Sequence, residues 1–167
     1  MRATVVVVCA CLLGVVACDD TPPAPGDGLA TVTHVVDGDT IDIRIDGRDE
    51  RVRLIGIDTP ETKRPNTPIE CYGPEASAFT AALLPAGTRV RVERDVVGRD
   101  DYGRILGYVH LVDEDGRPTT FVNLEIVREG YATPLSIEPN STYAADFSAA
   151  ARAAEDADLG LWSACSS

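Results

Sequence analysis

The residues best suited to chemistry lie in the stretch RVRLIGIDTPET, residues 51–62, where an apolar strand runs into two carboxylates. Arg51 and Arg53 lie at its start, and Asp58 and Glu61 lie at its end. Acidic side chains are seldom buried unless a cation or a hydrogen-bond donor pairs with them. Carboxylates bind hard cations, and a guanidinium binds two phosphate oxygens at once. The stretch therefore predicts a site for a metal ion, a phosphate group or both.

Two other short segments contain residues of the same kinds. VVDGDT places Asp37 and Asp39 on either side of a turn glycine, and RDDYGR contains Tyr102 and Arg104. Each segment alone also fits an ordinary solvated turn, because Asp-Gly pairs commonly form hairpin turns. Their chemical importance depends on whether the fold brings them to the carboxylates of residues 58–61.

Period-two alternation predicts the strands that must position these groups. Ile41, Ile43 and Ile45 alternate with polar residues, which is typical of a half-buried strand. Three strands are expected in ATVTHVVDGDTIDIRIDGRDERVRLIGID, a fourth in TRVRVERDV and a fifth in RILGYVHLV. Helices are expected in GPEASAFTAALLPAG, NLEIVREG and NSTYAADFSAAARAAEDADLG, the last capped by Asn140 or Ser141. These elements predict an α+β fold built on a small five-stranded barrel of the OB-fold type.

The spacing of Arg53 and Asp58 sets a geometric condition on the site. The two residues are five apart, so a regular strand would aim their side chains at opposite faces of the sheet. A bulge at Gly56, or a bend where the strand ends, would bring them together. We expect one of these two features.

Taken together, the motifs resemble the thermonuclease family, the staphylococcal nuclease-like enzymes. The resemblance runs from Thr31 to Trp162 and includes VDGDT, RLIGIDTPET, YGPEASAFT, YGR and GLW in the family's order. It implies a five-stranded OB-type barrel with three helices, in agreement with the elements expected above. The implied activity is hydrolysis of phosphodiester bonds in DNA and RNA, giving 3′-phosphate products.

The resemblance also implies a Ca²⁺ site. Its ligands would be the carboxylates of Asp39 and Asp58 and the backbone carbonyl of Thr59. Calcium takes six to eight oxygen ligands and accepts mixtures of carboxylate, carbonyl and water. Asp37 is expected to support the turn rather than to bind the ion. A zinc site is not expected, because the sequence has no cluster of His and Cys residues.

The remaining roles follow from the same resemblance. Glu61 corresponds to the residue that positions or deprotonates the attacking water, and Arg53 and Arg104 to the pair that binds the scissile phosphate. The expected substrate-binding residues are Tyr102, Lys63 and Arg64.

The sequence departs from the family at the periphery of the site. Asp101 stands where members often have a basic residue, and YATPLSIEPN lacks tyrosine at two positions that contact the nucleotide in staphylococcal-type enzymes. The alternative function is a non-catalytic OB-fold nucleic-acid-binding lipoprotein, because relatives of this fold have lost the site and kept the barrel. The presence of Arg53, Glu61 and Arg104 favours the enzyme, because a binding module would be free to lose them.

The N-terminal residues predict export. Residues 1–17 combine Arg2 with an apolar run, and their end, VVAC, resembles a bacterial lipoprotein signal in which Cys18 is lipidated. The polar, proline-containing residues 18–29 predict a disordered tether, and residues 30–165 the nuclease-like domain. We expect a monomeric protein that is exported and anchored to the cell envelope by lipid, with simple secretion as the alternative.

Charge and cysteine content refine this prediction. The chain has 15 basic and 27 acidic residues, a net charge of −12 that would repel a polyanion unless arginines or a metal supply local positive charge. Of the five cysteines, two would leave with the signal, and Cys18 would take the lipid if the chain is a lipoprotein. Cys71 and Cys165 remain, and in an oxidising compartment they are expected to form a disulfide rather than stay free thiols.

Overall fold

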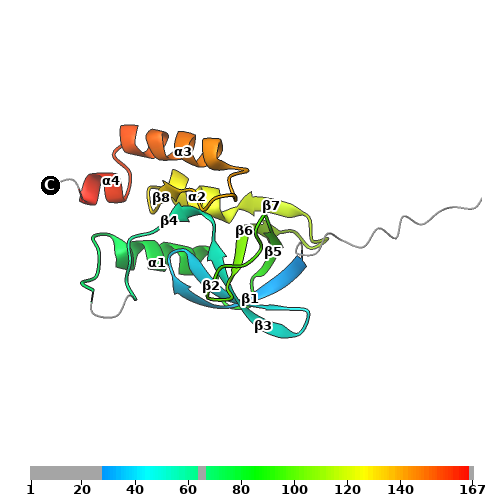
Figure 1. The fold of residues 1–167 in the computed structure, drawn as a ribbon. Helices are drawn as coiled ribbons and strands as arrows, with labels where there is room; N and C mark the ends of the chain where they lie inside the picture. Colours follow the sequence, from blue (N-terminus) through cyan, green and yellow to red (C-terminus); the bar gives the residue numbers. More distant parts are fainter. Residues whose placement is uncertain (1–27, 64–66, 166–167) are drawn as a thin grey trace, which may run out of the picture.

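Short strands and helices follow one another along the part of the chain that the structure describes. The computed structural model describes residues 28–63 and 67–165 (Figure 1). Its strands are β1 (Gly28–Asp37), β2 (Thr40–Ile45), β3 (Arg48–Leu54), β4 (Gly56–Asp58), β5 (Arg89–Glu93), β6 (Ile105–Val112), β7 (Pro118–Phe121) and β8 (Thr133–Leu135). Its helices are α1 (Gly73–Leu83), α2 (Val122–Arg128), α3 (Ala144–Asp156) and α4 (Leu161–Ala164). Among these residues no helix is long and apolar enough to cross a membrane.

Several sequence predictions concern residues outside the described ranges. The predicted signal segment, the lipidation residue Cys18 and the substrate-binding residue Arg64 all lie there. Most of the predicted tether lies there as well, but its last two residues, Gly28 and Leu29, belong to β1 and pair with β5. The first strand thus begins two residues before the expected domain start at position 30.

Five strands close into the predicted barrel. β1 pairs with β2 and β5, β2 pairs with β3, and β5 pairs with β6, all in antiparallel orientation. Residues 52–54 of β3 then pair in parallel with residues 105–107 of β6, and this contact closes the ring. β7 continues the sheet beyond β6, and β4 pairs with β8 in a separate two-stranded sheet. The architecture is the OB-fold barrel expected from the sequence.

The barrel interior is filled by the apolar faces of the alternating strands. Ile41 and Ile43 are fully buried, and burial of each side chain stabilises the fold by about 1.5–3 kcal/mol. α2 lies between α3 and the barrel (Figure 1), and Phe147 of α3 is fully buried within the same core. The centroid of its ring lies 6.2 Å from the ring centroid of Tyr108 in β6. The barrel and the C-terminal helices therefore share one core.

A bend at Gly56, between β3 and β4, meets the geometric condition for which the sequence predicted a bulge at this glycine or a bend at the strand end. Gly56 has a φ of 82°, a left-handed backbone that disfavours residues with a side chain. A Cβ at this position would lie 2.1 Å from the Phe147 ring, so the close packing of α3 also requires glycine. The buried amide of Asn123 in α2 donates to the Ile55 carbonyl at 2.9 Å and accepts the Val109 N–H at 2.9 Å. These contacts hold the bend against the barrel.

The helices differ from the sequence prediction in two respects. A fourth, short helix, α4, follows the three that were expected. The prediction that Asn140 or Ser141 caps α3 is wrong, because the N-cap is Tyr143 and makes no side-chain cap. Asn140 is used elsewhere: its amide accepts the Val97 N–H at 2.7 Å and donates to the Val97 carbonyl at 2.9 Å. A tertiary contact thus replaces the local cap.

Cys71 and Cys165 form a disulfide that joins the start of α1 to the end of α4, across 94 positions of the sequence. Replacing both with serine is expected to lower the free energy of unfolding by about 2–5 kcal/mol, because the link limits the entropy of the unfolded chain. Guanidinium denaturation of the two proteins measures this difference. A loss below about 1 kcal/mol would contradict a stabilising role.

Gly56→Ala is expected to destabilise the protein more than Gly47→Ala does. Both glycines have positive φ, but a Cβ at Gly47 would have no neighbour within 4 Å. Both variants should therefore lose about 1–2 kcal/mol for the backbone, and Gly56→Ala about 1–3 kcal/mol more for overpacking against Phe147. Denaturant unfolding gives both values, and equal losses would show that this contact is not tight.

Candidate active site

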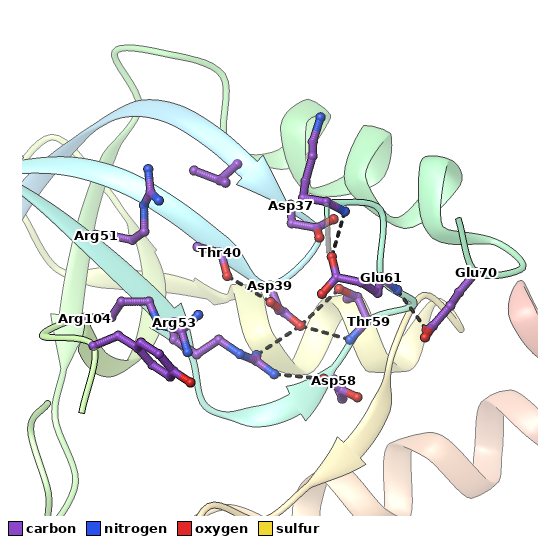
Figure 2. Close-up of a pocket in the computed structure, with 13 residues that line it drawn as sticks. Asp37, Asp39, Thr40, Arg51, Arg53, Asp58, Thr59, Glu61, Glu70 and Arg104 are labelled. Atoms are coloured by element: carbon purple, nitrogen blue, oxygen red, sulfur yellow. Dashed lines mark hydrogen bonds and ion pairs between the residues drawn. The ribbon is translucent and has the colours of Figure 1, made fainter. Parts of the chain in front are cut away.

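A polar cleft of about 640 Å³ lies where the β1–β2 turn, β3, the end of β4 and the loop before β6 meet. Every predicted catalytic, metal-binding or substrate-binding residue that the structure describes lines it: Asp39, Arg53, Asp58, Thr59, Glu61, Lys63, Tyr102 and Arg104. Figure 2 shows this cleft. The fold thus brings together motifs that are up to 65 positions apart, from residue 39 to residue 104.

The Arg53 side chain lies at the base of this cleft and is only 9% exposed. Figure 2 shows its guanidinium between two carboxylates, with Nη1 3.1 Å from Asp39 Oδ2 and Nη2 2.9 Å from Asp58 Oδ1. Nη1 also donates to the backbone carbonyls of Leu54 and Ile57, at 2.7 and 3.0 Å. These two carbonyls lie on either side of the bend. The bend therefore lets one guanidinium reach both of them, and the two hydrogen bonds stabilise the bend.

Asp39 is held from the other side by Thr59. The Thr59 N–H and hydroxyl both donate to Asp39 Oδ2, each at 3.1 Å, and the Thr40 hydroxyl donates to Oδ1 at 3.0 Å. Gly38 makes this approach possible, because a Cβ there would lie 2.6 Å from the Thr59 hydroxyl oxygen. The β1–β2 turn and the end of β4 are therefore packed directly on each other.

Asp37 supports the turn, as the sequence suggested. Its Oδ1 accepts from the hydroxyls of Ser77 at 2.7 Å and Thr62 at 2.9 Å and from the Gly38 N–H at 2.9 Å. Burial alone would raise the pKa of Asp37, but the hydrogen bonds, led by that of Ser77, outweigh burial and hold this pKa below its usual value. Asp37 thereby joins the turn to α1 and to the segment that contains Glu61.

Arg104 approaches the cleft from the loop before β6. Its Nε donates to Asp100 Oδ2 at 2.7 Å, which orients the guanidinium, and its side chain is 32% exposed. The guanidinium lies 5.5 Å from the centre of the Tyr102 ring, which is 87% exposed. Sequence reasoning missed Asp100, although its place four residues before Arg104 in RDDYGR is a usable signal.

Glu61 lies opposite the arginines, and its Oε1 accepts the Lys63 N–H at 2.7 Å. Its own N–H donates to the carboxylate of Glu70 at 2.9 Å. Sequence reasoning also missed Glu70, because no local pattern connects two residues on either side of a proline-containing loop.

The comparison with protein families supports what this geometry suggests. The family model described as staphylococcal nuclease homologue matches residues 51–164. The chain belongs to this family. It is 46% identical over 131 residues to the thermonuclease of Staphylococcus intermedius, covering 78% of this chain and 74% of the relative.

Other relatives agree with this assignment. The thermonuclease of Staphylococcus hyicus is 40% identical over 132 residues, which cover 79% of this chain and 74% of the relative. Endonuclease YncB of Bacillus subtilis (strain 168) is 36% identical over 135 residues, which cover 80% of this chain and 61% of the relative. These matches support a nuclease.

The oxygen atoms of the cleft suit a hard cation of the kind this nuclease family implies. Five carboxylates and four basic side chains line it among the described residues, so added positive charge would be favourable. No group of three or more His, Cys, Asp or Glu side chains in the described ranges could hold a metal ion by itself. Calcium fits this donor set, because carbonyl and water oxygens can complete its coordination. Asp39, Asp58 and the Thr59 carbonyl remain the predicted ligands, as the family resemblance implies.

A second network fixes the loop that leads to Arg104 in this nuclease fold. Asp95, just after β5, accepts from the Thr142 N–H and hydroxyl, both at 3.0 Å, and from the Tyr108 hydroxyl at 3.0 Å. Burial alone would raise the pKa of Asp95, but these bonds outweigh burial and hold the pKa below its usual value. The segment before Arg104 is therefore tied to the start of α3.

This network predicts a pH-dependent contribution to stability. Because folding lowers the pKa of Asp95, its stabilising effect is present above the unfolded pKa of about 3.9 and is lost as pH falls through the folded value. The difference in unfolding free energy between the unsubstituted chain and Asp95→Asn should shrink as the solution is acidified below about pH 4. Denaturation between about pH 2.5 and pH 7 measures it, and a constant difference would contradict the assignment. Thr142→Val removes the hydroxyl donor to Asp95. The difference in unfolding free energy between the unsubstituted chain and this variant should also shrink on acidification, but by a smaller amount.

Proposed function

We propose that this chain is a calcium-dependent nuclease that hydrolyses phosphodiester bonds of DNA and RNA and leaves 3′-phosphate products. The observation that carries the proposal is the grouping of two arginines, Arg53 and Arg104, with Glu61 and two aspartates in one cleft. A non-catalytic nucleic-acid-binding module would have no need of this grouping. The kinship with thermonucleases and endonucleases supports the same reaction.

The two arginines would bind the scissile phosphate from different sides. Arg53 is fixed by Asp39, Asp58 and two carbonyls, so little side-chain entropy remains to be lost when a phosphate binds. Arg104 is oriented through Nε by Asp100, which directs its planar donor group. Charge that develops on the phosphoryl oxygens in the transition state would be stabilised by both guanidinium groups.

Glu61 would position a water molecule and accept its proton as the water oxygen bonds to phosphorus. The bond from phosphorus to the 5′ oxygen then breaks, and the 5′ oxygen leaves and takes up a proton, so that the phosphate stays on the 3′ side. A bound Ca²⁺ would supply Lewis-acid charge stabilisation at the phosphate. Tyr102 and Lys63 line the same cleft and would contact the neighbouring parts of the nucleotide.

The proposal includes export and a lipid anchor at Cys18. It is supported by the signal-like N-terminus and by the Cys71–Cys165 disulfide, since disulfides persist in oxidising compartments outside the cytosol. Simple secretion would satisfy the same observations if cleavage removed Cys18.

The test is cleavage of denatured DNA and of RNA by the purified chain, with calcium and with excess chelator. We expect cleavage only with calcium, and a loss of about 10²–10⁴-fold in kcat for Glu61→Gln, because general-base catalysis contributes that much. Glu75→Gln, at an exposed acidic residue of α1 outside the cleft, should keep full activity.

The products and the failures of this assay are equally informative. Fragments should end in 3′-phosphate, detectable as a block to extension until a phosphatase removes it. A folded chain that binds oligonucleotides but does not cleave them would favour the binding module. Cleavage that persists in chelator would contradict the calcium dependence.

A further inference from the structure

Glu70 holds both backbone polar groups of Glu61. Its carboxylate accepts the Glu61 N–H at 2.9 Å, and its own N–H donates to the Glu61 carbonyl at 3.0 Å. Figure 2 shows the Glu70 side chain reaching across to the Glu61 backbone at the edge of the cleft. The Glu61 backbone is therefore held by a residue nine positions further along the chain.

The residues after Glu70 pack equally closely against the Glu61 segment. A Cβ at Gly73 would lie 2.7 Å from the Thr62 methyl carbon and 3.1 Å from the Pro60 carbonyl oxygen. The Gly73 N–H also donates to the Glu70 carbonyl at 3.1 Å. Residues 70–73 thus form a tight support beneath residues 60–62, and movement of one segment would displace the other.

This support is itself attached to the C-terminal helices. Cys71, next to Glu70, is bonded to Cys165 at the end of α4, and the Tyr72 ring stacks on Tyr131 with centroids 5.4 Å apart. α4 is fixed in turn, because the Leu161 N–H donates to the Gly130 carbonyl at 2.9 Å. A continuous series of contacts therefore runs from α4 through the disulfide to Glu61.

We propose that Glu70 is a positioning residue for Glu61 and that the Cys71–Cys165 disulfide holds Glu70 in the position this requires. The proposal rests on the proposed function, in which Glu61 activates water. Catalysis by a general base depends on its placement, and a displacement of about 1 Å can lower the rate by about 10²-fold. The disulfide would then contribute to turnover as well as to stability.

The kinetic test compares Glu70→Ala, Glu70→Gln and Glu75→Ala. Loss of the acceptor in Glu70→Ala should lower kcat by about 10- to 100-fold with little change in KM, since the phosphate-binding arginines are untouched. Glu70→Gln should recover most of the activity, because its amide oxygen can accept the same N–H. Glu75→Ala controls for the loss of an acidic residue and should leave kcat unchanged.

The role of the disulfide is tested by Cys71→Ser combined with Cys165→Ser, assayed well below its unfolding temperature. The kcat of this variant should also fall. In the variant that combines it with Glu70→Ala, the total fold-loss in kcat should be smaller than the product of the two separate fold-losses, because both changes act through one segment. If Glu70→Ala, or the serine variant in its folded state, kept kcat within about twofold of the unsubstituted chain, the corresponding part of the proposal would be overturned.

A measurement independent of activity separates this inference from the proposed function. In NMR spectra, Glu70→Ala should speed exchange of the Glu61 amide proton by about tenfold or more, while Glu75→Ala should not. Unchanged exchange would overturn the positioning contact. Faster exchange in a chain that never cleaves nucleic acid would contradict the proposed function and leave Glu70 with a structural role only.

Discussion

The buried guanidinium of Arg53 is the group on which the arrangement of the cleft depends. A cation removed from water is costly unless its donors are paired, and here two carbonyls and two carboxylates pair with it. The four acceptors come from the β1–β2 turn and from both sides of the bend after β3. The Arg53 guanidinium therefore links the β1–β2 turn, the end of β3 and the segment of β4. The same requirement explains why Gly56 must allow the chain to turn so sharply.

Local sequence patterns predicted the barrel for physical reasons, whereas the family resemblance predicted the site residues, which the structure gathers in one cleft. Alternation in β2 follows directly from burial of one face, as Ile41 and Ile43 show, and chemical motifs concentrate at strand ends and turns. The supporting residues were not predictable in this way, because their partners are remote. Asn123 binds Ile55 across 68 positions, and Asn140, which looks like a helix cap, binds Val97 across 43. Only the folded chain defines such pairs.

The acidic character of the chain extends into the cleft. Arg51 is paired with Asp42, Arg104 with Asp100, and Arg53 with two aspartates, so these guanidinium groups already have anionic neighbours. A phosphate entering the cleft would meet oriented donors within a field that is negative overall. On the proposed function, a bound cation would therefore carry more of the substrate affinity than it would in a basic protein. Pairing with aspartates orients the arginines but weakens their long-range attraction for a phosphate.

The parallel contact between β3 and β6 has a consequence for the order in which the protein folds. Arg53 pairs with Leu106, two residues after Arg104, so the ring closure also brings the two arginines to the same cleft. This contact joins residues about fifty apart and cannot form until much of the chain has been made and has collapsed. Until this contact forms, the segments of Arg53 and Arg104 are not joined, so a partly folded chain lacks the cleft in which both arginines lie.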